Sequence, residues 1–74
     1  MIREFDKIVL TRNIASKGLK KGDIGTVVFI HNNDEGYEIE FFTLDGTTRS
    51  VETLNASDVR PVKTNEVARA REIA

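Results

Sequence analysis

The stretch Leu19–Ile30, LKKGDIGTVVFI, decides the fold of this chain of 74 residues. Two glycines, Gly22 and Gly25, lie three residues apart, and a run of strand-forming residues follows them. A phosphate-binding P-loop would lead into a helix and carry a Lys-Ser or Lys-Thr pair, whereas these glycines lead into a strand. We therefore interpret Gly22 as a turn residue with a positive φ angle, and Gly25 as the site of a bulge where the strand begins.

Further strand-forming segments on both sides of this stretch predict a mainly β fold. The expected strands are residues 5–12, 26–31, 37–42, 47–54 and 59–62. Within 26–31 both faces are apolar, which predicts burial on both sides and places Phe29 in the core. The segment 37–42 alternates, so we expect its odd-numbered residues to face the core. The outward residues are then Glu38, Glu40 and Phe42.

The connections between these strands carry turn-forming residues. The sequence NNDEG at 32–36 and the pair Asp45-Gly46 predict two tight reversals. Asn55 can cap one helical turn before the last strand, and Pro61 places that strand at an edge. Five short strands with these connections predict an SH3-like barrel, in which closure of the sheet removes exposed edges.

The end of the chain differs in character from the rest. We expect residues 1–62 to form the barrel and residues 63–74 to form a C-terminal tail, which is either a short helix or frayed. Val67, Ala70 and Ile73 share one face at helical spacing, but this apolar stripe is thin. A segment of about ten residues is marginal as an isolated helix.

Composition excludes several classes of function. The chain has 11 basic and 12 acidic residues and a formal net charge of -1, which gives no overall attraction to nucleic acid. It has no cysteine and one histidine, His31, so we expect no disulfide, no metal site and no cofactor. No apolar run approaches the roughly 20 residues of a membrane span, so a cytoplasmic location is expected. A domain this small supplies only about 3–5 kcal/mol of net stability, which favours a binding partner.

Four blocks carry a family resemblance: FDKIVLTRNI, GLKKGDIGTVV, YEIEFFTLDG and ASDVRPV. Together they resemble the small bacterial family called domain of unknown function 4926, over Phe5–Val62. The resemblance implies an SH3-like barrel that is often encoded beside a predicted nuclease toxin. It therefore implies a protein-binding role of antitoxin or immunity type, with no catalytic residues.

An acidic surface is the first candidate for the binding site. Carboxylates in the turn and on the outward side of the third strand would form a stripe that attracts a basic protein, such as a nuclease. An outward aromatic residue beside them would contribute a binding hot spot. The predicted partner-binding residues are Asp34, Glu35, Glu38, Glu40 and Phe42.

A basic loop gives the alternative function, a KOW-like RNA-binding domain. The segment KGDIGTVV is similar to the strand-turn-strand segment of such domains, and the loop before it is rich in lysine. The residues that would contact RNA are Arg12, Lys17, Lys20 and Lys21. A third interpretation, a structural or oligomerising domain, leaves a homodimer open. One histidine near several acids does not define a catalytic site, so we expect no enzymatic activity.

Overall fold

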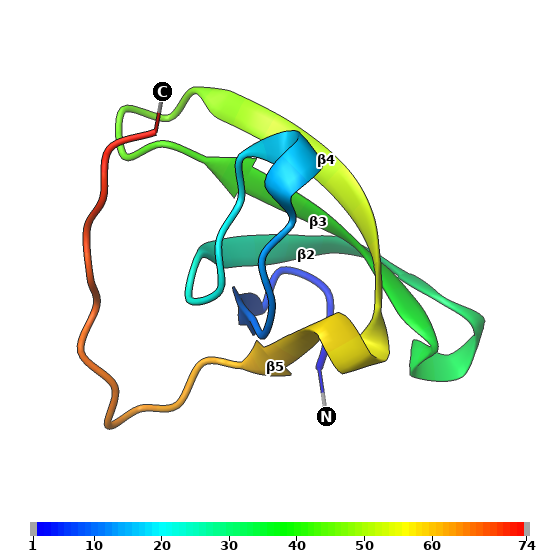
Figure 1. Ribbon diagram of the computed structural model, residues 1–74. Coiled ribbons are helices and arrows are strands. Elements are labelled where there is room, and N and C mark those ends of the chain that lie inside the picture. The colour runs from blue at the N-terminus through cyan, green and yellow to red at the C-terminus, as the bar shows by residue number, and fades with distance from the viewer. Residues whose placement is uncertain (1, 74) are drawn as a thin grey trace.

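The computed structural model describes residues 2–73, which form one small β domain (Figure 1). Its strands are β1 (Lys7–Leu10), β2 (Ile24–His31), β3 (Gly36–Phe42), β4 (Thr48–Asn55) and β5 (Val59–Pro61). Three short 3-10 turns separate some of them: η1 (Ala15–Lys17), η2 (Asn32–Asp34) and η3 (Ala56–Asp58). The predicted mainly β fold with five strands is confirmed. None of the helical turns in the described part of the chain has the length and apolarity that crossing a bilayer requires.

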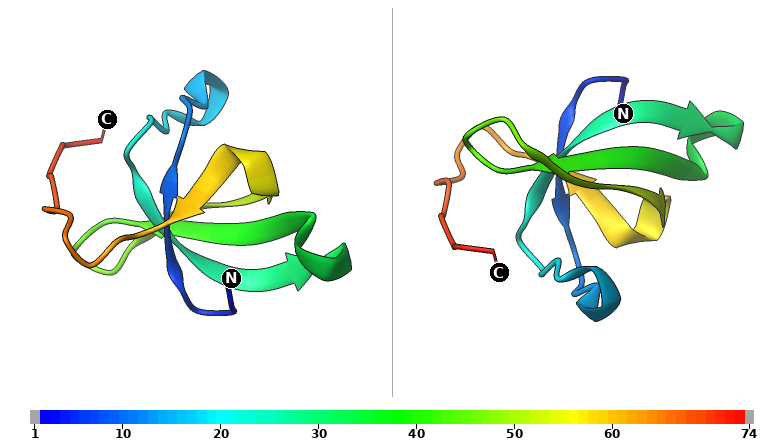
Figure 2. Two further views of the ribbon diagram at one scale, coloured as in Figure 1. Left: turned by 90° about the horizontal axis from the view of Figure 1, so that it is seen from below. Right: turned by 90° about the horizontal axis from the view of Figure 1, so that it is seen from above.

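The five strands form one antiparallel sheet in the order β4-β3-β2-β1-β5. The sheet is strongly twisted, so that β1 runs across the direction of β3 (Figure 2). The expected closed barrel is not formed, because β4 and β5 are the two edges and do not pair with each other. β5 has only three residues, all of which pair with β1. Its Pro61 also lacks the N–H that a further ladder would need.

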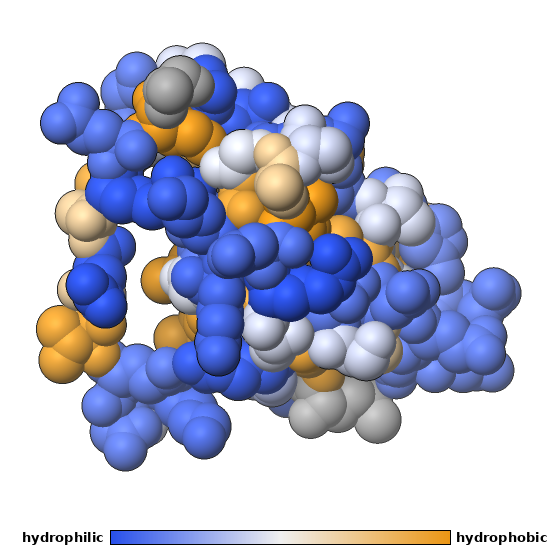
Figure 3. Space-filling model, in the orientation of Figure 1, coloured by the Kyte–Doolittle hydropathy of each residue, from blue (hydrophilic) through white to orange (hydrophobic). Residues whose placement is uncertain are grey.

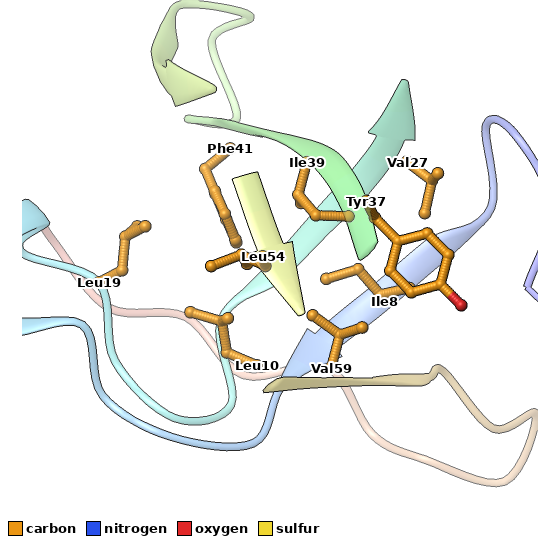
Figure 4. Close-up of a cluster of buried hydrophobic side chains, with 9 residues drawn as sticks. All are labelled: Ile8, Leu10, Leu19, Val27, Tyr37, Ile39, Phe41, Leu54 and Val59. Carbon is orange, nitrogen blue, oxygen red and sulfur yellow. The ribbon is translucent and has the colours of Figure 1, made fainter. Parts of the chain in front are cut away.

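The hydrophobic core lies in the concave side of this sheet. Each strand contributes at least one buried side chain, and Leu19 folds in from the long loop between β1 and β2. Figure 4 shows these side chains converging from the five strands and that loop. The core residues are Ile8, Leu10, Leu19, Val27, Tyr37, Ile39, Phe41, Leu54 and Val59.

The first strand is shorter than expected. The sequence predicts 5–12, but β1 covers Lys7–Leu10. Phe5 has a φ angle of 70°, which a strand does not accommodate, and 73% of its surface is exposed. Phe5 still donates its N–H to the carbonyl oxygen of Val27 at 2.6 Å, so it lies beside β2 as the chain enters the sheet.

Phe29 does not lie in the core as the sequence predicts. The register of β2 against β3 shifts between Val27 and Phe29, which marks a bulge. Before the shift Val27 pairs with the buried Ile39, and after it Phe29 pairs with Glu38, which faces outward. The bulge therefore moves Phe29 to the outer side of the sheet, where 51% of its surface is exposed.

The two glycines that open the second strand have different roles. Gly22 has a φ angle of 95°, which confirms the predicted turn. Gly25 is not at a bulge: it pairs in regular register with Ile8. A Cβ atom added to Gly25 would collide with the side chain of Ile39 and lie 2.9 Å from Phe41 Cε1. Glycine is required there because the side chains of β3 pack directly against the backbone of β2.

The predicted reversals are confirmed, and one of them has an unusual backbone. Asn32, Asn33 and Asp34 have φ angles of 39°, 55° and 72°, so three successive residues adopt the left-handed conformation. Between β3 and β4, Gly46 has a φ angle of 89° as the hairpin turns. The cap before β5 is also present, as Asn55 and Asp58 form a reciprocal capping box.

The tail contains no helix within residues 63–73, so the helical alternative for the C-terminus is wrong. We call residues 63–73 the arm. Arg60 binds Glu66 through two hydrogen bonds of 2.8 and 2.6 Å, and Arg71 binds Asp23 at the other end. Figure 1 shows the arm arching away from the end of β5, and Figure 3 shows an opening between the arm and the rest of the molecule. Val67 is 89% exposed, so the apolar stripe of the arm is not buried against the sheet, and a segment this short is marginal as an isolated helix.

Candidate functional site

The outward side of β3 is arranged as the sequence predicts. Tyr37, Ile39 and Phe41 are buried, with no more than 4% of their surface exposed. The alternate residues therefore point away from the core, and Phe42 is 43% exposed. This side of the sheet contains three of the five predicted partner-binding residues.

Cross-strand pairing places further residues beside them. Glu38 lies between Phe29 on β2 and Thr53 on β4, and Glu40 lies opposite Val51 on β4. Directly paired residues of an antiparallel sheet share one face, so these side chains form one continuous surface. We call this surface the outer face: Phe29, Glu38, Glu40, Phe42, Val51 and Thr53.

The outer face combines exposed apolar groups with carboxylates. Phe29, Phe42 and Val51 expose 51%, 43% and 53% of their surfaces. Glu38 and Glu40 lie between them on β3 and are half-buried. Exposed apolar side chains are ordinary when single, but three on one face around two carboxylates make a patch with both polar and apolar character.

Glu38 is held in place by two neighbours. His31 Nε2 lies 2.6 Å from Glu38 Oε2, and the Thr53 hydroxyl lies 2.8 and 2.9 Å from the two carboxylate oxygens. These hydrogen bonds, from His31 first and Thr53 second, hold the pKa of Glu38 below its ordinary value. Glu38 therefore presents an oriented negative charge at neutral pH.

Glu40 and Phe42 have a different environment. The Thr48 hydroxyl donates to Glu40 Oε2 at 2.6 Å. The Lys7 ammonium lies 5.3 Å from the centre of the Phe42 ring, in the geometry of a cation–π contact. Lys7 also donates to the Thr26 hydroxyl at 2.7 Å. One face of the exposed Phe42 ring is thus covered by a cation, and the acidic stripe includes a positive charge that the sequence did not reveal.

The two acidic residues of the turn are only partly joined to this surface. Glu35 and Glu38 line a shallow hollow of about 300 Å³ at the end of β2 and β3, together with His31 and Asn55. Asp34 is half-buried on η2. The pKa of the Tyr37 hydroxyl is raised above its ordinary value, first by burial and second by the negative charge of Asp34. The predicted site therefore runs along β3: Glu35 and Glu38 lie near the η2 turn, Glu40 lies in the middle of the strand, and Phe42 lies at its other end.

The four residues of the predicted basic patch differ in their environment. Arg12 Nε donates to Asp58 Oδ1 at 2.8 Å, and this hydrogen bond raises the pKa of the guanidinium and lowers that of the carboxyl. Lys17, Lys20 and Lys21 are exposed on the loop between β1 and β2. All four predicted residues lie on this loop, and Arg12, whose side chain is 55% exposed, is paired with Asp58.

The backbone around Gly22 is already hydrogen bonded. The amide of Lys20 donates to Asp23 Oδ2, and the amide of Lys21 donates to Asn13 Oδ1, each at 2.8 Å. The amides of Gly22 and Asp23 donate to the carbonyl oxygens of Leu10 and Lys20, each at 2.9 Å. Four consecutive amides are therefore used internally, and a carboxylate occupies the position that an anion would take. The loop does not form a phosphate cradle.

His31 contacts two neighbours, Phe29 and Glu38. Its ring packs edge-on against Phe29 at 4.9 Å between ring centres, and Nε2 faces Glu38. Across residues 2–73, no group of three or more histidine or carboxylate side chains is arranged to hold a metal ion. In the structure His31 orients Glu38 from the neighbouring strand.

Sequence reasoning missed Phe29, Val51, Lys7 and Arg71. Val51 could have been found, because the buried Leu54 fixes the inward side of β4 and so places Val51 on the opposite side. Phe29 could not, because the bulge after Val27 has no sequence signature. Arg71 donates hydrogen bonds to the carboxylate of Asp23 and to the carbonyl oxygen of Gly18, which lie 48 and 53 residues earlier in the sequence. Local sequence patterns do not reveal such contacts.

Comparison with known proteins gives one match. No curated protein and no solved structure matched the chain. A family model described as domain of unknown function (DUF4926) matches residues 4–61, from the segment before β1 to the last residue of β5. The match covers the whole sheet and leaves the arm outside. The chain therefore belongs to the DUF4926 family, as the four sequence blocks indicate.

Proposed function

We propose that this protein is a non-catalytic protein-binding module and that the outer face is its binding surface. The observation that carries the proposal is that three exposed apolar side chains, Phe29, Phe42 and Val51, share one face of paired strands. The carboxylates Glu38 and Glu40 of β3 lie between them. Aromatic residues are enriched among the hot spots of protein interfaces, and the apolar side chains here surround a polar centre.

The rigidity of the side chains on the outer face supports a binding role. Glu38 and Glu40 are fixed by hydrogen bonds from Thr53 and Thr48, so little side-chain entropy would be lost when a partner binds. Both carboxylates lie on β3, which has a strand on each side. A rigid surface with oriented negative charges attracts a partner whose contact surface is basic.

We propose further that the partner is a nuclease and that the role is of antitoxin or immunity type. A nuclease surface is basic because it binds phosphates, so it would complement the carboxylates of the outer face. The association with nuclease toxins is what the family resemblance implies. The proposed architecture is SH3-like, supported by the long loop between β1 and β2 and by the 3-10 turn η3 between β4 and β5.

The test is binding to the product of the neighbouring gene, measured by titration calorimetry. Phe42→Ala should weaken binding about thirtyfold or more, because truncation of an aromatic anchor costs at least about 2 kcal/mol. Leu44→Ala is the matched control, since Leu44 is 99% exposed but lies on the loop after β3. Unchanged affinity of the Phe42 variant would refute the assignment of the outer face.

RNA binding through Lys17, Lys20 and Lys21 is the alternative proposal, and the exposure of these three side chains supports it. It predicts an affinity for labelled RNA that falls steeply as salt is added. A variant with all three lysines changed to glutamine should then lose that binding. Absence of RNA binding at low salt would exclude the alternative and would leave the protein-binding proposal unaffected.

A further inference from the structure

β4 is a long edge strand whose second side has no strand neighbour among residues 2–73. It has eight residues, Thr48–Asn55, and it pairs with β3 in regular register over Ser50–Asn55, with a bulge at Arg49. The other edge of the sheet, β5, has three residues and ends in a proline. Natural sheets protect exposed edges with short strands, proline, bulges or charged side chains. β5 is short and ends in proline, whereas β4 contains no proline and has a regular stretch, Ser50–Asn55, beyond its bulge. The outward backbone groups along β4 can therefore accept another strand.

We propose that the β4 edge binds β4 of a second copy of this chain, which gives a symmetric dimer with one continuous sheet. A two-fold axis perpendicular to the sheet pairs odd-numbered residues with odd-numbered ones and even-numbered residues with even-numbered ones. The outer faces of the two copies therefore stay on the same side of the sheet. The register we propose places Val51 on the axis, opposite Val51 of the second copy. Homodimers with this isologous symmetry are the commonest oligomers.

The chemistry of β4 fits this register on the outer side. Val51 is 53% exposed, and directly opposite side chains in an antiparallel pair lie about 4.5–5.5 Å apart, so the two valines would cover each other. β4 contains one arginine and one glutamate, so two copies of the strand do not repel each other through net charge.

The inner side of β4 supplies a second, independent observation. Ser50 Oγ is buried and has no hydrogen-bond partner among the described residues. In the proposed register Ser50 lies opposite Glu52 of the second copy, and the reciprocal pair forms on the other side of the axis. Rotation of the Ser50 side chain about its Cα–Cβ bond then directs the hydroxyl to a carboxylate acceptor. Buried polar groups without partners are rare, and this pairing would satisfy one in each copy.

The dimer goes beyond the proposed function, because it needs no partner protein and leaves most of the outer face free. Val51 and Thr53, which lie on β4, are shared between the two surfaces. Because the outer faces of the two copies would lie side by side, a dimer would present Glu38, Glu40 and Phe42 twice. Failure of the dimer would therefore leave the proposed function intact, and failure of partner binding would leave the dimer intact.

Cysteine cross-linking tests the register directly, because the natural chain has no cysteine. We expect Val51→Cys to form a disulfide-linked dimer about tenfold faster than Phe29→Cys, because β4 pairing raises the effective concentration of the two thiols. The control is matched, since Phe29 and Val51 are 51% and 53% exposed on the same face. In denaturing urea the two rates should become equal. Equal rates in native buffer would overturn the proposal.

Sedimentation velocity with the unlabelled protein gives a test that does not depend on cross-linking. We expect the natural chain to self-associate as its concentration rises toward the millimolar range. Val51→Lys should abolish this association, because it places two positive charges opposite each other on the axis. The position is exposed, so the variant should fold, and circular dichroism checks that. A natural chain that stays monomeric at millimolar concentration would refute the dimer.

Discussion

Replacing Gly25 with alanine should destabilise the fold strongly, although alanine adds a single methyl group. The added Cβ collides with the side chain of Ile39 and lies 2.9 Å from Phe41 Cε1 and 3.1 Å from the carbonyl oxygen of Glu40. Ile39 and Phe41 are 0% and 3% exposed, so neither side chain can move outward. The carbonyl oxygen belongs to the backbone of β3 and is equally constrained.

The magnitude follows from two opposing effects. Overpacking of a tight core costs typically 1–3 kcal/mol, and we take about 3 kcal/mol because three atoms are approached at once. Alanine is better than glycine in a strand by roughly 0.5–1 kcal/mol, which offsets part of this cost. We therefore expect a net loss of about 2 kcal/mol, which is a large share of the roughly 3–5 kcal/mol available to so small a domain.

Urea unfolding measures this loss. Tyr37 is the single tyrosine, it is buried, and the chain has no tryptophan, so its fluorescence reports the core. With a slope of about 1 kcal/mol per molar urea, the unfolding midpoint should fall by about 2 M. Gly22→Ala is the control: nothing lies within 4 Å of its added Cβ, so its cost comes from the positive φ angle alone.

A double-mutant cycle identifies the cause. Ile39→Leu removes the methyl branch that collides with the new Cβ and nearly conserves the side-chain volume. Gly25→Ala should therefore cost less when it is combined with Ile39→Leu than when it is made alone, whereas the cost of Gly22→Ala should be the same in both cases. A Gly25→Ala variant that unfolds at the same urea concentration as the natural protein would refute the close packing of β3 on β2.

Three further perturbations test the cap and the arm. Asp58→Ala removes half of the capping box together with the acceptor of Arg12 and should cost at least about 1 kcal/mol in urea unfolding, while Asp58→Asn keeps an acceptor and should cost less. Arg60 lowers the pKa of Glu66 to about 2, so the contact with Arg60 is complete above pH 4.5 and is lost as the pH falls toward 2; a carboxyl NMR titration with its midpoint near 4.5 would contradict this. Asp23→Asn weakens the contact with Arg71, so trypsin should cleave the arm faster while the urea midpoint stays nearly constant; unchanged cleavage would show that the arm is held elsewhere.

The number of strands and the inward side of β3 could be predicted because they depend on local signals. Alternation from Tyr37 to Phe42 fixes which residues are buried, and each residue faces the side expected of it. Gly22 and Gly46 mark turns because few other residues adopt positive φ angles. The fold class and the family resemblance therefore follow from the sequence.

The remaining features depend on contacts between distant residues. The bulge after Val27 is set by how β2 fits against β3, and it moves Phe29 from the core to the outer face. Closure of the sheet depends on whether β5 reaches β4, and a three-residue strand paired with β1 does not. The pairing of Arg12 with Asp58 is an interaction across 46 residues of sequence, which local patterns do not reveal.

The left-handed turn at Asn32, Asn33 and Asp34 limits which amino acids can replace these three residues without loss of stability. For most amino acids each such conformation costs roughly 1–2 kcal/mol, whereas asparagine, aspartate and glycine adopt it readily. Exposed loops usually accept almost any substitution, but this one should accept only those three residue types at three successive positions. A saturation library selected for folding should therefore show a narrow choice at 32–34 and a broad choice at Leu44, which also lies on a surface loop but has a negative φ angle.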